Sequence, residues 1–337
     1  AAMRTRMMFL SIALWIPLNL PAADYKVTHL VEDKVFKGTT LLADMSDPRN
    51  PRVVEVDFNG NILWKFIPPS SIRGAILDAA KLQNGNILIT VHDSGIYEIS
   101  RSRKIVWQHK DPGASHDADR LPNGNTLYNL GWGKKGDDVV REVDPEGKVV
   151  WSWNGLADYD RDPFANIEAE GWMHVNAVTR LKNGNTLVSI RNFSTIAEVA
   201  PNKRVVRDWT FKGNNKRAGL RTKGRIEGQR NHEPEILDNG HMLVALRGPN
   251  RFVEFDLDTE EIIWSWQHPG GRRELRTNRD ANRLPNGNTL GTAGNKLIEI
   301  AADGTIVWQM MAPNIGENRR KFHKAIRIGI NGTSFGG

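Results

Sequence analysis

Leu121-Pro122-Asn123-Gly124-Asn125 is one copy of a motif, Leu-x-Asn-Gly-Asn, that the chain contains five times. The copies are Leu82–Asn86, Leu121–Asn125, Leu181–Asn185, Leu237–His241, where histidine replaces the last asparagine, and Leu284–Asn288. Their glycines are separated by 39, 60, 56 and 47 residues. Repetition at this period, with Asn-Gly turns and β-branched runs, is typical of the blades of a β-propeller.

Each copy is the first turn of a predicted four-stranded unit. Residues 117–121 alternate like a strand, and Asn123-Gly124 tolerates the positive φ that a tight hairpin needs. A second hairpin follows and ends at Lys148–Trp153. The same apolar ending recurs at Trp64, Trp107, Trp151, Trp264 and Trp308. We interpret these tryptophans as packing between neighbouring blades.

The number of repeats predicts six blades. Lys37–Leu42 is a degenerate earlier copy, and Phe322–Ile328, followed by Asn331-Gly332, is a late fragment. We predict an all-β fold: a six-bladed β-propeller of four-stranded antiparallel blades, closed by pairing of the N- and C-terminal strands. Phe322–Ile328 would complete the first blade and so remove an open sheet edge. The alternative is a truncated seventh blade.

The two ends of the chain differ in composition from the repeats. Residues 1–23 carry Arg4 and Arg6 before the apolar stretch Met7–Leu18, which Pro17 interrupts. This stretch is too short for a stable membrane span, so it predicts a signal peptide and a periplasmic or secreted protein. Residues 24–330 are expected to form one propeller domain, and residues 331–337 a disordered tail. The oligomeric state is left open.

The charge of the chain favours small anionic partners. Its 337 residues carry a formal net charge of +7 and include no cysteine, so neither disulfides nor thiol chemistry is expected. Basic residues gather in two runs, Lys212–Arg230 and Arg272–Arg279. Proteins that bind single-stranded nucleic acid interleave such charges with aromatic side chains, and these runs lack them. We therefore expect no nucleic acid partner and no stable membrane insertion.

Functional side chains recur at one register position. The residues five before the leucine of each motif are Leu77, His116, Asn176, His232 and Arg279. His174 stands two residues before Asn176, on the same side of the strand if side chains alternate. Eight residues after the first asparagine of the turn stand His92, Arg191 and Arg247. Because these two positions are adjacent in a hairpin, we predict a ring of these residues near one mouth of the central channel.

The residue types in this ring suit an anion. Histidine provides a nucleophile or a general acid or base near neutral pH. Arginine offers a planar fork of donors for sulfate, phosphate or carboxylate. Three histidines also suit a metal ion. The adjacent arginines would repel a cation, so no metal is predicted.

At these residues the chain resembles the bacterial arylsulfate sulfotransferase family, the phenolic-donor type that does not use a nucleotide sulfate, within the PQQ-like β-propeller superfamily. The resemblance lies in Gly171–Val178 with Leu187–Asn192, in His116–Asn125 and in Gln229–Glu233. The repeats extend it over roughly residues 30–330.

The resemblance implies a reaction and a role for each residue. A histidine, His232 by position, would attack the sulfur of an aryl sulfate ester, release a phenol and form a sulfohistidine that a second phenol then cleaves. His174, Asn176 and Arg191 would hold the sulfuryl oxygens, and His116 would transfer the phenolic proton. Arg247, Arg279 and His92 are the further substrate-binding candidates from the register. No cofactor is implied, and the partners would be aryl sulfates and phenols.

Two other classes of protein share this architecture. One is a non-catalytic propeller that binds an anionic ligand, a glycan or a protein partner at the same mouth. The other is a quinone-dependent dehydrogenase of the same superfamily, which would carry a calcium site of carboxylates. The sequence shows no such acidic cluster, so this second alternative is disfavoured.

Overall fold

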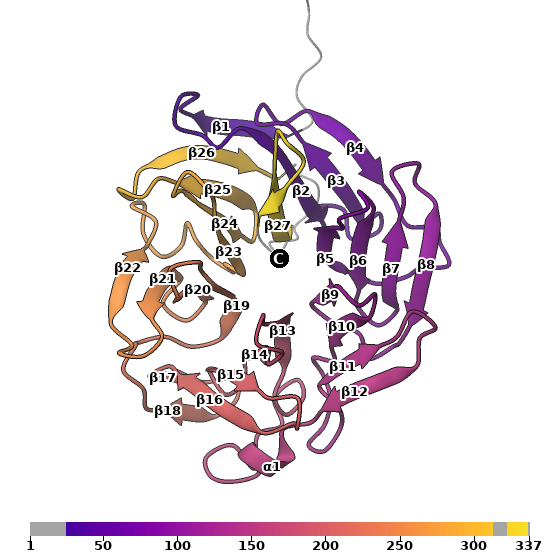
Figure 1. Ribbon diagram of the computed structural model, residues 1–337. Helices are drawn as coiled ribbons and strands as arrows, with labels where there is room; N and C mark the ends of the chain where they lie inside the picture. Colours follow the sequence, from indigo (N-terminus) through magenta and orange to yellow (C-terminus); the bar gives the residue numbers. More distant parts are fainter. Residues whose placement is uncertain (1–24, 313–321, 336–337) are drawn as a thin grey trace, which may run out of the picture.

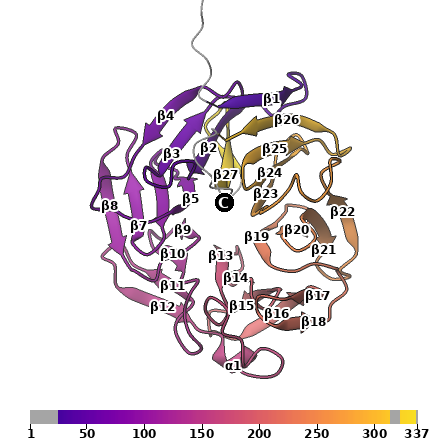
Figure 2. The ribbon, with the colours of Figure 1, turned by 180° about the vertical axis from the view of Figure 1, so that it is seen from behind.

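The protein is a ring of six antiparallel β-sheets around a central axis, as the computed structural model shows for residues 25–312 and 322–335 (Figure 1). The view from behind shows the same closed ring (Figure 2). The prediction of an all-β, six-bladed propeller is confirmed, and the alternative of a truncated seventh blade is wrong. Residues 1–23, the predicted signal peptide, lie outside the described residues.

The blades follow one another around the ring, and the strands of each blade run in order from the axis outward. Blade 1 contains β27 (Phe322–Gly329), β2 (Gly38–Asp44), β3 (Arg52–Val56) and β4 (Ile62–Phe66). Blade 2 contains β5 (Ile76–Lys81), β6 (Ile87–Val91), β7 (Gly95–Ile99) and β8 (Ile105–Lys110). Blade 3 contains β9 (Ala118–Arg120), β10 (Thr126–Asn129), β11 (Val140–Val143) and β12 (Val149–Trp153).

The other half of the ring has the same plan. Blade 4 contains β13 (Val175–Arg180), β14 (Thr186–Ile190), β15 (Thr195–Val199) and β16 (Val205–Thr210). Blade 5 contains β19 (Asn231–Ile236), β20 (His241–Leu246), β21 (Arg251–Asp256) and β22 (Ile262–Trp266). Blade 6 contains β23 (Asp280–Arg283), β24 (Thr289–Ala293), β25 (Lys296–Ile300), β26 (Ile306–Met311) and, on its outer edge, β1 (Lys26–Leu30).

Few elements lie outside the blades. A hairpin of β17 (Gly213–Asn215) and β18 (Leu220–Thr222) is inserted between blades 4 and 5, and α1 (Leu156–Tyr159) is a single turn between blades 3 and 4. Among the described residues, no helix has the length and apolar composition of a membrane span.

The repeated motif forms the hairpin between the two inner strands of a blade. In blade 3, Gly124 adopts φ 88°, and its N–H donates to the carbonyl of Leu121. The amide of Asn125 reaches across to the third strand and donates to Glu142 at 2.6 Å. The motif therefore fixes the turn between the first two strands and also connects this turn to the third strand of the blade.

The tryptophans lock neighbouring blades together, as the sequence predicted. Trp107 Nε1 donates to the carbonyl of Pro145 in the next blade at 2.8 Å. The Arg120 guanidinium lies 4.3 Å from the centre of the Trp107 ring and pairs with Glu98 at 3.1 Å. The same hydrogen bond to the following blade is made by Trp64, Trp151, Trp209, Trp266 and Trp308. In blade 5 it is Trp266, and not the expected Trp264, that makes it.

Both ends of the chain close the ring, in different blades. The C-terminal β27 pairs with β2 as the innermost strand of blade 1, as predicted, and the N-terminal β1 pairs with β26 in blade 6 (Figure 1). The expected disordered tail is wrong for residues 331–335. A turn at Gly332, with φ 83°, leads into β28 (Ser334–Phe335), which pairs with β27.

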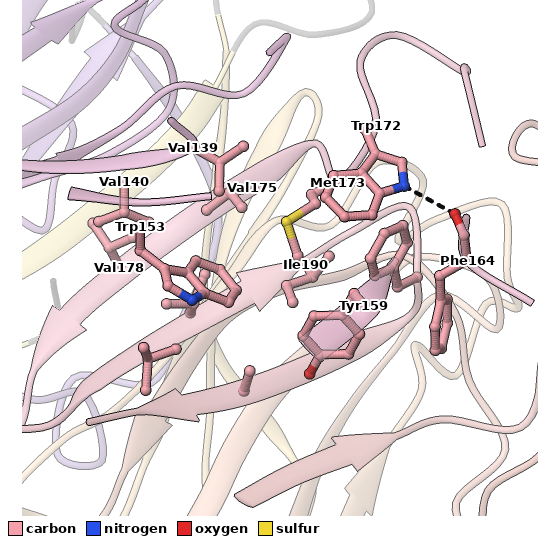
Figure 3. Close-up of a cluster of buried hydrophobic side chains, with 14 of the residues drawn as sticks. Val139, Val140, Trp153, Tyr159, Phe164, Trp172, Met173, Val175, Val178 and Ile190 are labelled. Atoms are coloured by element: carbon pink, nitrogen blue, oxygen red, sulfur yellow. Dashed lines mark hydrogen bonds between the residues drawn. The ribbon is translucent and has the colours of Figure 1, made fainter. Parts of the chain in front are cut away.

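One apolar cluster holds the loop that precedes blade 4. Trp153, Tyr159, Trp172 and Met173 pack with Ile190 between blades 3 and 4, and the Trp172 indole donates to the carbonyl of Phe164 at 2.9 Å (Figure 3). Trp172 and Met173 are completely or almost completely buried. This packing fixes the backbone immediately before His174.

Candidate functional site

The structure brings the sequence-predicted ring together on the channel axis. His116 lies with its ring centroid 5.2 Å from that of His174 and 6.4 Å from that of His232. All three side chains are at most 6% exposed. His116 and His232 meet because their blades present the same register position to the axis, and His174, just before β13, joins them in one small buried cluster.

A sixth member of the ring, His323, was missed. It stands on β27, and Gly329 takes the place of the motif leucine in the turn that follows. Its ring centroid lies 5.5 Å from that of His116 and 6.5 Å from that of His232. His323 is six residues before Gly329 and not five, so counting back from the turn gives Lys324 and did not find it.

Arg191 is fixed between His174 and Glu170. His174 Nδ1 donates to the carbonyl of Glu170 at 2.8 Å, so its Nε2 accepts from Arg191 Nη1 at 2.5 Å. Arg191 Nη2 donates to the Glu170 carboxylate at 3.0 Å. Burial, followed by the charge of Arg191, lowers the pKa of His174 to about 3. The lone pair of His174 is thus engaged in a hydrogen bond. His174 is therefore better suited to orient Arg191 than to act as a nucleophile.

The expectation that strand alternation positions His174 is wrong. His174 precedes β13 and has φ 48°, and a bulge follows it between Val175 and Ala177. Regular alternation of side chains therefore does not apply there. The anchored loop of Trp172 and Met173 brings the ring to the site instead.

His232 is a neutral imidazole beside an arginine. Arg247 Nη1 lies 3.4 Å from His232 Nε2, and His232 Nδ1 is buried without a hydrogen-bond partner. Burial first, and then the charges of Arg247 and Arg279, lower the pKa of His232 well below 6.5. A neutral imidazole keeps the lone pair that nucleophilic attack needs. The contact from Arg247, at 3.4 Å, engages this lone pair less than the 2.5 Å hydrogen bond from Arg191 engages that of His174.

His116 is oriented by a short hydrogen-bond chain. Ser115 Oγ donates to Asn129 Oδ1 at 2.6 Å, so it accepts from His116 Nδ1 at 3.0 Å. This assigns the proton to Nδ1 and leaves the lone pair on Nε2. Burial and the neighbouring His174 lower the pKa of His116 well below 6.5.

The remaining predicted residues surround this centre in different ways. Asn176 Nδ2 donates to the carbonyl of Asn231 at 2.9 Å, next to His232. Arg279 Nη1 donates to the carbonyl of Phe322 at 3.2 Å. His92 lies further out, 3.1 Å from the Asp93 carboxylate and about half-buried.

Trp132 was also missed. Its ring is stacked on His116 at 4.9 Å between centroids and makes edge contacts with His92 at 4.1 Å and with His174 at 4.9 Å. It follows Gly131 in a loop, and a lone tryptophan there gave no periodic signal. Trp132 lies between the buried histidines and solvent, since 39% of its surface is exposed.

An acidic cluster lies one register position further along the inner strands, contrary to the sequence analysis. The carboxylates of Asp117, Glu233 and Asp78 lie 2.5, 2.9 and 3.6 Å from Lys324 Nζ. The residues at this position are Asp78, Asp117, Glu233, Asp280 and Lys324. The ammonium of Lys324 is thus the cation among these carboxylates. In the part of the chain that the structure describes, no group of side chains has the arrangement of a metal site.

The burial of this cluster changes the acidity of its members. Burial raises the pKa of Asp78 to about 7 and that of Asp280 to about 6, although Lys324 opposes both shifts. Asp117, Asp78 and Glu233 raise the pKa of Lys324 well above 10.5, against the effect of burial. The charged lysine therefore holds together inner strands from four blades.

Solved structures share the fold of this chain at low sequence identity. A protein of unknown function from Bacteroides caccae is 19% identical, with a TM-score of 0.60 over 86% of this chain and 98% of its own. A streptogramin B lyase is 13% identical, with a TM-score of 0.55 over 93% and 94% of the two chains. Virginiamycin B lyase from Staphylococcus aureus is 10% identical, with a TM-score of 0.51 over 85% and 88%. These likenesses concern the fold alone.

The family comparison concerns the sequence itself. No curated protein sequence matches the chain. The model of the arylsulfotransferase (ASST) family matches residues 24–213, more than half of the chain. The matched part contains His116, His174 and Arg191, and it ends before His232 and His323. On this match, the chain belongs to the arylsulfotransferase family.

Proposed function

We propose that this protein transfers a sulfuryl group from a phenolic sulfate ester to a phenol, through a sulfohistidine on His232. Membership of the family supports aryl sulfotransferase activity in general. The observation that carries the finer proposal is the pairing of the neutral His232 with Arg247, inside a buried cluster that also contains Arg191 and Arg279.

In the first half-reaction, His232 Nε2 attacks the sulfur of the ester. The N–S bond forms, the bond between sulfur and the aryl oxygen breaks, and the oxygen leaves as a phenolate, which water then protonates. Arg247 lies beside the attacking nitrogen at 3.4 Å, where it can take up charge from the sulfuryl oxygens. Preorganised donors of this kind act on charge that develops in the transition state, and removing one typically costs about 10²–10³ in rate.

In the second half-reaction, a phenol attacks the sulfur and returns the electron pair of the N–S bond to His232. The incoming oxygen must lose its proton, and His116 is the base that the resemblance implies. His116 Nε2 carries the lone pair, because Ser115 fixes the proton on Nδ1. General acid–base assistance by a positioned histidine contributes about 10²–10⁴ in rate.

The other residues are positioning residues in this scheme. His174 fixes one nitrogen of Arg191, and Glu170 fixes the other, so the guanidinium cannot turn away from the cluster. Asn176 was expected to hold sulfuryl oxygens. Its N–H donates instead to the Asn231 carbonyl, so we assign it the task of fixing the strand that presents His232.

The test is incubation with a chromogenic aryl sulfate and a phenol acceptor. The wild-type protein should release the donor phenol in a burst, form the sulfated acceptor and gain the mass of one sulfuryl group on His232. The His232→Asn variant should do none of these while keeping its circular dichroism spectrum. If the wild-type protein releases no phenol at any pH but still binds aryl sulfates, it is the non-catalytic anion-binding propeller.

The proposal includes the place of action. Arg4, Arg6 and the apolar stretch Met7–Leu18 have the pattern of a secretory signal, so we infer a periplasmic or secreted enzyme. Fractionation of expressing cells, with N-terminal sequencing of the recovered protein, tests this. Recovery of the uncleaved chain in the cytoplasm would contradict it.

A further inference from the structure

Trp132 covers the histidine cluster at the boundary with solvent. Single exposed apolar side chains are common on protein surfaces and need no explanation by themselves. Trp132 differs because its indole lies nearly parallel to the ring of His116, with an interplanar angle of 14°, and touches two further imidazoles at its edges. An aromatic face is therefore fixed directly above the proposed reaction centre.

The backbone around Trp132 is held closely. A Cβ on Gly131 would come within 2.7 Å of Ser115 Oγ, and one on Gly171 within 2.9 Å of the Trp132 backbone. The carbonyl of Gly133 accepts the N–H of Trp172 at 2.9 Å. The loop cannot shift far without losing these contacts, so the indole is a fixed platform.

A cavity of about 680 Å³ opens beside this platform. Its volume lies within the range of about 300–1,000 Å³ that is usual for small-molecule sites. Trp132, Ile167 and Trp172 give it an apolar wall, and Lys134, Lys135 and Glu168 are its charged lining residues. Trp172 is fixed by the core shown in Figure 3.

The two lysines differ in whether they form an ion pair. Lys135 pairs with Asp160. Lys134 is exposed, and none of the ion pairs found among the described residues involves its ammonium group. A flat aromatic ring with a second negative group matches this combination of apolar wall and cationic edge.

We propose that Trp132 and this cavity form the aryl-binding subsite, and that it selects aryl sulfates and phenols that carry a carboxylate, held by Lys134. The inference rests on the proposed sulfuryl transfer, since it places the aryl ring of the sulfate ester against Trp132, next to His116. Stacking on an aromatic face adds to the burial of apolar surface, so loss of the platform should weaken aryl binding by up to about 10-fold.

Three sulfate esters test the subsite: phenyl sulfate, cyclohexyl sulfate, which has no flat ring, and 4-sulfooxybenzoate, which carries a carboxylate. Trp132→Ala should raise KM for phenyl sulfate about 10-fold and remove the preference over cyclohexyl sulfate. Trp132→Phe should restore most of the affinity for phenyl sulfate and most of the preference over cyclohexyl sulfate. Lys134→Gln should remove only the preference for 4-sulfooxybenzoate over phenyl sulfate, and Lys148→Gln, at an exposed turn of the same blade, should change nothing.

The outcomes separate this inference from the proposed function. If the wild-type protein turns over phenyl sulfate, but Trp132→Ala and Trp132→Phe both keep its KM and its preference, the subsite is refuted and the activity stands. If the wild-type protein releases no phenol, calorimetric binding of 4-sulfooxybenzoate still decides the subsite. The affinity of 4-sulfooxybenzoate for the wild-type protein should be about 10-fold higher than its affinity for Trp132→Ala or for Lys134→Gln. Equal affinities for the three proteins would overturn the proposal.

Discussion

Replacing Lys324 by methionine should destabilise the whole ring. Met keeps the length of the side chain and removes its charge, so Asp117 and Glu233 lose partners at 2.5 and 2.9 Å. Breaking a buried ion pair by removing one partner typically costs about 3–5 kcal/mol. A large domain loses about 2 °C of thermal midpoint per kcal/mol, so the midpoint should fall by about 6–10 °C.

The loss should depend on pH in a definite direction. The folded-state pKa of Lys324 is raised above 10.5, so the stability that its charge contributes is fully present below that pH and is lost only as pH rises through the folded pKa. Between pH 5 and pH 8, Lys324 stays charged, and within this cluster only the carboxylates change their protonation state. Asp78 and Asp280, with pKa values of about 7 and about 6, are mostly protonated at pH 5, so Lys324→Met should cost less at pH 5 than at pH 8.

Urea unfolding of the wild-type protein and the variant at both pH values measures this effect. Lys148→Met, at an exposed position, is the matched control and should be neutral. Adding Asp117→Asn to Lys324→Met should recover part of the loss, because one of the unpaired carboxylates is gone. A loss below about 1 kcal/mol at pH 8, the size of an exposed ion pair, would refute the view that this lysine holds the inner strands together.

Three further predictions concern the reaction. Arg191→Lys should lower the turnover rate because it keeps the charge but not the fork, and Arg191→Ala should lower it further, by about 10²–10³; normal turnover with a lower thermal midpoint would make Arg191 purely structural. Because burial and Arg247 hold the pKa of His232 well below 6.5, the reactive neutral form persists at lower pH, and kcat/KM for nitrophenyl sulfate should stay flat from pH 8 to pH 5.5. An ordinary histidine would lose about 10-fold there. His116 is the base of the second half-reaction, so His116→Gln should slow transfer to the phenol acceptor about 100-fold and leave the burst of donor phenol unchanged; an equal loss in the burst would argue against this role.

The architecture could be predicted because its determinants are local. An Asn-Gly turn requires a left-handed glycine whatever surrounds it, and each copy of the motif therefore marks one hairpin and one blade. The register of His116 and His232 follows from the turn by counting, since strand geometry is the same in every blade. Counting along the repeats also gave Arg191 and placed His174 two residues before Asn176, although the backbone that presents His174 is not the regular strand that was assumed.

The rest depended on ring closure and on irregular loops. The sequence predicted β27 in blade 1, but His323 stands one residue further from its turn than His116 and His232 do from theirs, so counting did not bring His323 to the axis. The acidic cluster gathers single residues from four blades, so no segment of the sequence looks acidic. Trp132 lies in a loop whose course is set by close contacts at two glycines and not by a period. The sequence by itself thus determined the blades and one register of candidate residues, because turns and strand periodicity are properties of neighbouring residues. The tertiary structure decided which of the distant side chains meet and how each is charged, because contact and burial depend on the closed ring.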